Sequence, residues 1–111
     1  MYNVAFHNRL DASFDEKIVC TGSRTPSSYA NLKRRITHRL KNNFPSLINR
    51  TDIVVRAMLR LEGETSFLPF KDEIFRRDIA GKRINFGVVV RIEKKPEREF
   101  YPSLLLNGAF D

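Results

Sequence analysis

Short apolar stretches recur along the chain at lengths typical of strands. Five stretches of this kind are present, at residues 2–7, 17–21, 52–62, 65–70 and 84–92. In the third stretch, Val55 and Leu59 fall on one side and Arg56 on the other, which is the period of a strand with one buried face. Pro69 has no backbone N–H, so it places the fourth stretch at a sheet edge or a strand end.

Two other parts of the chain have the spacing of a helix with one buried side. The first is a stripe at intervals of three and four residues, formed by Tyr29, Leu32, Ile36 and Leu40. Its start is capped by Thr25 followed by Pro26, or by Ser28 one turn later. Residues 72–80 predict a second, shorter helix that ends at Gly81.

From residue 17 onward the elements follow one another as strand, helix, strand, strand, helix, strand. This is the order of the ferredoxin-like, split βαβ arrangement. Residues 2–7 add an extra N-terminal strand, and the polar segment 8–16 predicts a long loop after it. At 111 residues the chain is long enough for one core and too short for two, so we expect a small single α+β domain. We expect residues 100–111 to form an apolar C-terminal tail that packs on the body or on a partner.

The composition favours a protein that remains where it is made. No apolar run reaches the roughly 18 residues of a membrane span, and residues 1–9 lack the basic and apolar regions of a signal peptide. The single cysteine, Cys20, cannot form a disulfide within the chain, which is usual in a reducing compartment. We expect an intracellular, cytoplasmic protein, with a nuclear location left open.

Residues able to carry catalysis are few and widely separated in the sequence. Cys20, His7 and His38 are the candidates for nucleophile and base, yet Cys20 lies in an apolar strand and His38 on an exposed helical side. One cysteine and two histidines at these positions match no metal-ligand spacing. The sequence therefore predicts a non-catalytic protein that needs no metal or cofactor.

The excess positive charge is concentrated in one third of the chain. The net charge is +7, and residues 24–60 hold nine cations against one acid, leaving eleven cations and twelve acids elsewhere. Such an uneven distribution predicts a basic surface, and basic surfaces favour polyanionic partners such as nucleic acids.

The candidate phosphate-binding residues come from the first helix, the loop before it and the polar side of the long strand. They are Arg24, Lys33, Arg34, Arg35, His38, Lys41, Arg56 and Arg60. Residues 22–25 also precede a helix start, where backbone N–H groups attract anions. We expect RNA or DNA as the partner, bound as a single strand or without sequence specificity. Whether the helix and strand residues form one surface depends on packing that the sequence leaves open.

Two other interpretations remain. The apolar tail, with strand residues Val54, Met58 and Val89 expected to be exposed, would suit a protein partner or a homo-oligomer. The basic helix would suit an anionic membrane surface, although its apolar stripe lacks the bulk that such helices usually present.

Overall fold

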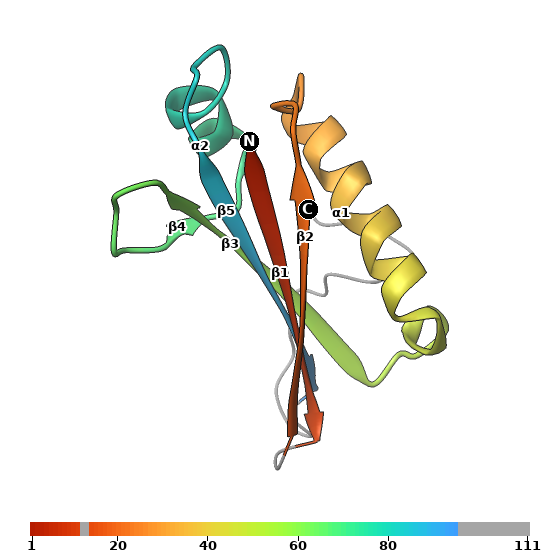
Figure 1. The fold of residues 1–111 in the computed structure, drawn as a ribbon. Helices are drawn as coiled ribbons and strands as arrows, with labels where there is room; N and C mark the ends of the chain where they lie inside the picture. Colours follow the sequence, from red (N-terminus) through yellow and green to blue (C-terminus); the bar gives the residue numbers. More distant parts are fainter. Residues whose placement is uncertain (12–13, 96–111) are drawn as a thin grey trace.

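The structure of this chain is a computed structural model, and it describes residues 1–11 and 14–95, without the side chains of residues 11–15. The predicted tail at residues 100–111 lies outside the described part. The elements in chain order are β1 (Tyr2–Asp11), β2 (Phe14–Gly22), α1 (Tyr29–Asn43), the 3₁₀ turn η1 (Pro45–Leu47), β3 (Ile53–Leu61), β4 (Leu68–Pro69), α2 (Asp72–Asp78) and β5 (Phe86–Lys94). Figure 1 shows this arrangement, which confirms a small α+β domain with the predicted order of elements and an extra N-terminal strand.

The strands of the described residues form one five-stranded sheet, in the order β2-β1-β5-β3-β4. β1 pairs with β5 in parallel, and every other neighbouring pair is antiparallel. The extra N-terminal strand is therefore an internal strand, lying between β2 and β5. The two-residue strand β4 forms an edge, as the proline in it predicts.

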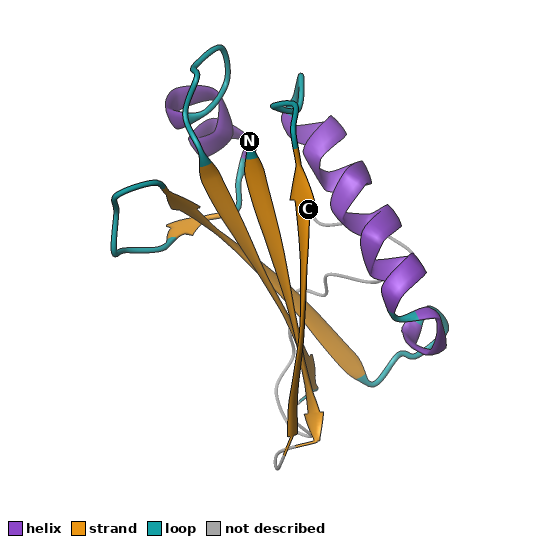
Figure 2. Cartoon of the chain, in the orientation of Figure 1, coloured by secondary structure: helices purple, strands orange, loops and turns teal. Residues whose placement is uncertain are grey.

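Both helices pack on the same side of the sheet, so the domain has two layers (Figure 2). The predicted helical stripe Tyr29, Leu32, Ile36 and Leu40 is buried along its whole length. It joins one core with alternate residues of the strands, among them Val4, Phe6, Val55, Leu59, Val88 and Val90. The side chains between these residues point to the opposite side of the sheet. We call that side, which neither helix covers, the open face.

A capping hydrogen bond at the start of α1 and a glycine after α2 explain where these helices begin and end. The backbone N–H of Asn31 donates to the Ser28 hydroxyl at 3.0 Å, so the later of the two predicted caps is the correct one. α2 ends at Asp78, two residues before the predicted end, and Gly81 follows it with φ +71°, a conformation that favours glycine.

The predicted long loop at residues 8–16 is wrong. β1 continues to Asp11 and β2 begins at Phe14, with Asn8 opposite Glu16 and a register shift between Asn8 and Asp11. Backbone pairing persists here although most of the residues are polar, and this end of the hairpin reaches beyond the end of α1 (Figure 1). The polar residues obscure the alternating pattern that marks a half-buried strand, although Leu10 packs against the core.

Candidate nucleic-acid interface

The outward side of α1 is strongly basic. The helix carries five cations and no acid, and the burial of its apolar stripe turns its charged side to solvent. Arg34, His38, Arg39 and Lys41 are all exposed. The amide nitrogen of Asn42 lies 3.1 Å from His38 Nε2, one turn further along. We call these exposed residues, with Lys33 and Arg35 at the edges, the α1 basic surface.

The two edge cations also hold parts of the fold together. Arg35 Nη1 donates to the carbonyl oxygen of Arg24 at 3.0 Å and to the hydroxyl of Tyr2 at 3.3 Å. The ammonium group of Lys33 lies 4.9 Å from the centre of the Tyr29 ring, within the range of a cation–π contact. The first of these contacts brings Arg24 beside α1, so six of the eight predicted residues lie on the helix side of the domain.

Arg56 and Arg60 lie on the other side. Both belong to the residues of β3 that point away from the core, whereas Val55 and Leu59 point toward the helices. The eight predicted residues therefore do not form one surface, because the sheet separates the six near α1 from the two on β3.

On the open face, the strand register aligns four basic side chains. Arg56 on β3 pairs with Arg91 on β5, Arg91 pairs with His7 on β1, and His7 pairs with Lys17 on β2. We call these four residues the cationic row. The sequence analysis did not name Lys17 and Arg91 as candidates and considered His7 only for catalysis. Each occupies a polar position in an alternating strand, and only the pairing of β1 with β5 brings them into line.

A less charged area lies beside the cationic row. The next line across the sheet is Val19, Ala5, Val89 and Met58, and the one after it is Thr21, Asn3, Gly87 and Arg60. Val19 is 53% exposed, whereas Met58 and Val89 are half-buried. Val54, expected to be exposed, is only 4% exposed. One acid, Glu93, belongs to the same face of β5, two residues after Arg91.

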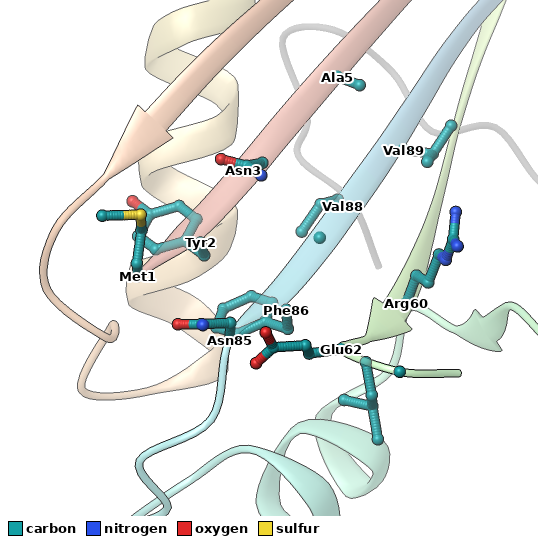
Figure 3. Close-up of a pocket in the computed structure, with 13 residues that line it drawn as sticks. Met1, Tyr2, Asn3, Ala5, Arg60, Glu62, Asn85, Phe86, Val88 and Val89 are labelled. Carbon is teal, nitrogen blue, oxygen red and sulfur yellow. The ribbon is translucent and has the colours of Figure 1, made fainter. Parts of the chain in front are cut away.

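A hollow of about 430 Å³ lies at the end of the sheet where β1 and β5 begin. Figure 3 shows Asn3 and Ala5 from β1, Val89 from β5 and Arg60 from β3 around it. Gly87 contributes only backbone to this lining. Beyond Arg60, the backbone N–H of Glu62 donates to the carbonyl oxygen of Asn85 at 3.0 Å, which holds these two polar residues together at one end of the hollow.

Three acids away from these surfaces, Asp52, Asp72 and Asp78, are paired locally. Arg50 donates two hydrogen bonds to Asp52, and this contact lowers the pKa of Asp52 to about 2. Arg77 likewise holds the pKa of Asp78 below its usual value through a side-chain hydrogen bond. A further ion pair joins Arg76 and Asp72 within α2. The charges of Arg50, Arg76 and Arg77 are thus compensated by their own neighbours.

The three residues considered for catalysis point in different directions. Cys20 packs against the helix layer, where its Sγ lies 3.8 Å from Asn43 Nδ2, whereas His7 lies on the open face and His38 on the outside of α1. Within residues 1–11 and 14–95, no three His, Cys, Asp or Glu side chains gather in a way that could hold a metal ion. No helix in the same part of the chain is long and apolar enough to cross a membrane.

Comparison of the chain with protein families, with curated proteins and with solved structures finds no match in any of the three. The described residues thus present two basic surfaces on opposite sides of the sheet.

Proposed function

We propose that this protein is a non-catalytic nucleic-acid-binding protein that holds phosphate groups against the α1 basic surface. The observation that supports this function is the complete absence of acids from a helix with five cations. Phosphate contacts of this kind fix a protein on RNA or DNA without reading sequence.

The concentration of positive charge on α1 destabilises the helix, and a bound polyanion would reduce this destabilisation. Arg35 and Arg39 are one turn apart, and like charges at this spacing destabilise a helix. The first turn contains no acid to balance the positive end of the helix dipole, and the next residue is Lys33. A helix selected only for solubility would mix both signs of charge along its exposed side. Phosphates bound along α1 would remove this repulsion.

The function is tested by measuring the binding of purified protein to labelled single-stranded RNA, single-stranded DNA and duplex DNA. At about 50 mM salt we expect binding that weakens strongly by about 200 mM, as phosphate-driven binding does. The double variant Arg34→Glu/Lys41→Glu should bind at least about tenfold more weakly, because two phosphate contacts become repulsive.

The matched control is Lys71→Glu/Arg83→Glu, which makes the same change in net charge at exposed residues outside both basic surfaces. Circular dichroism checks that both double variants keep the fold. The proposed function is wrong if the wild-type protein binds none of the three nucleic acids at the lower salt concentration, or if the α1 variant and the control bind equally well.

A further inference from the structure

The cationic row places two arginines, Arg56 and Arg91, directly opposite each other on neighbouring strands. Neighbouring strands lie about 4.8 Å apart, and like charges directly opposite each other are destabilising. Arg91 has a basic partner on each side, Arg56 on β3 and His7 on β1, and Lys17 extends the line to the edge strand. Arg56, Arg91 and Lys17 give this line across the sheet a positive potential, and its length suits a series of phosphate groups.

The hollow on the same face is suited to a different chemical group. Gly87 contributes no side chain to the lining of the hollow. A Cβ at this position would lie 3.9 Å from the carbonyl oxygens of Asn3 and Arg60, which is an ordinary contact distance, so a side chain would fit there. Glu62, at one end of the hollow, disfavours a phosphate, but its carboxylate can accept hydrogen bonds from the amino groups of a base.

The walls of the hollow also match a base. Ala5 and Val89 supply apolar contact, and the amides of Asn3 and Asn85 can pair with the polar edges of a ring. The guanidinium group of Arg60 is a plane on which a base can stack, and its Nε is oriented by a hydrogen bond of 3.0 Å to the carbonyl oxygen of Glu64.

The two features are connected along the strands. Ala5 and Val89, at the edge of the hollow, are each two residues from a member of the cationic row, which is about 7 Å along a strand. A chain whose phosphates follow the row would thus have its bases next to the hollow. A base can enter the hollow only if it is unpaired and unstacked, which excludes a base inside a duplex.

We propose that the open face binds single-stranded nucleic acid, with phosphates along the cationic row and an unpaired base in the hollow over Gly87. This inference rests on the proposed function and assigns to it a second surface and a class of substrate. The open face then provides the preference for single-stranded over duplex nucleic acid, whereas the α1 basic surface attracts any nucleic acid.

The test uses Gly87→Val, which places a branched side chain in the hollow without changing charge. The fold should tolerate it, because the new Cβ meets only ordinary contacts and valine favours strands. We expect its affinity for a labelled single-stranded oligonucleotide to fall about tenfold, as for the loss of one stacked base, with duplex binding unchanged. Arg91→Glu should weaken single-stranded binding at least about fivefold through the lost phosphate contact. The control Lys71→Glu should bind like the wild type.

Inorganic polyphosphate, which has phosphates and no bases, separates the two parts of the site. Arg91→Glu should weaken its binding and Gly87→Val should not. Equal loss with Gly87→Val would mean that the hollow holds phosphate, which contradicts the assignment of a base to it. If both open-face variants bind single strands as well as the wild type while the α1 variant does not, this inference is wrong and the proposed function stands. If the wild-type protein binds no nucleic acid, the proposed function itself fails.

Discussion

Arg56 on β3 and Arg91 on β5 are direct cross-strand partners on the open face of the sheet. In antiparallel strands such partners have their Cβ atoms about 5 Å apart, and like charges at this position repel. The pair lies in a row that His7 and Lys17 continue across two further strands. Arg56 and Arg91 therefore repel each other across this pair, and a substitution of Arg91 should remove that repulsion.

The first prediction concerns this repulsion. Arg91→Gln keeps a long polar side chain and removes one of the two facing charges, so it should raise the free energy of unfolding by about 0.5 kcal/mol. Urea denaturation at low salt measures the change, and added salt should shrink it because salt screens the repulsion in the wild type. Lower stability of the variant at low salt would show that the two arginines do not repel each other.

The second prediction concerns the two glycines in strands. A side chain at Gly22 would overlap the ring of its cross-strand partner Tyr2, whereas one at Gly87 would meet only ordinary contacts. Gly22→Ala should therefore lower the free energy of unfolding by about 1–3 kcal/mol through overpacking. Gly87→Ala, the matched control, should leave stability unchanged or slightly higher. Equal stabilities for the two variants would contradict this account of the Tyr2 ring.

The third prediction concerns the start of α1. The Ser28 hydroxyl accepts from the N–H of Asn31 at 3.0 Å, so Ser28→Ala should cost about 1 kcal/mol of stability. Thr25→Ala, at the alternative cap suggested by the sequence, should cost much less. Thermal or urea unfolding of the two variants distinguishes the caps, and a larger loss at Thr25 would place the helix start earlier than in the structure.

The fourth prediction concerns pH. The hydrogen bonds from Arg50 lower the pKa of Asp52 to about 2, below the value of about 4 for a carboxyl in an unfolded chain. A carboxyl with a lowered pKa in the folded state stabilises the fold above pH 4 and loses this contribution as the pH falls from about 4 to about 2. Asp52→Asn should lack this part of the acid sensitivity. Titration by NMR should give Asp52 a midpoint near 2 in the wild type and a higher one in Arg50→Gln. An unchanged midpoint in that variant would contradict the role of Arg50.

Features that depend on local periodicity could be predicted from the sequence. The stripe from Tyr29 to Leu40 is buried as its spacing predicts, because a helix places residues three and four apart on one side. The alternation in β3 correctly separates Arg56 from the core. Ser28 is one of the two caps that the sequence allows, and the structure selects it.

Features that depend on contacts between distant segments could not be predicted. β1 lies between β2 and β5, and its parallel pairing places Tyr2 opposite Phe86, two residues separated by most of the chain. Alternation shows which side chains share a face but not which strands are neighbours. The cationic row was therefore missed, because Lys17 and Arg91 align with Arg56 only through this pairing. The same limitation left open the relation between the helix and strand cations, which lie on opposite sides of the sheet.

The most direct test of the account is the salt dependence of nucleic-acid binding. The slope of log affinity against log salt concentration counts the phosphates that the protein neutralises. If the α1 basic surface contacts about three phosphates of a single strand, α1 accounts for a slope of about −2, and Arg34→Glu/Lys41→Glu should lose most of that contribution while Lys71→Glu/Arg83→Glu retains it. A wild-type affinity independent of salt, or the same slope in both double variants, would contradict the proposal that α1 holds phosphates.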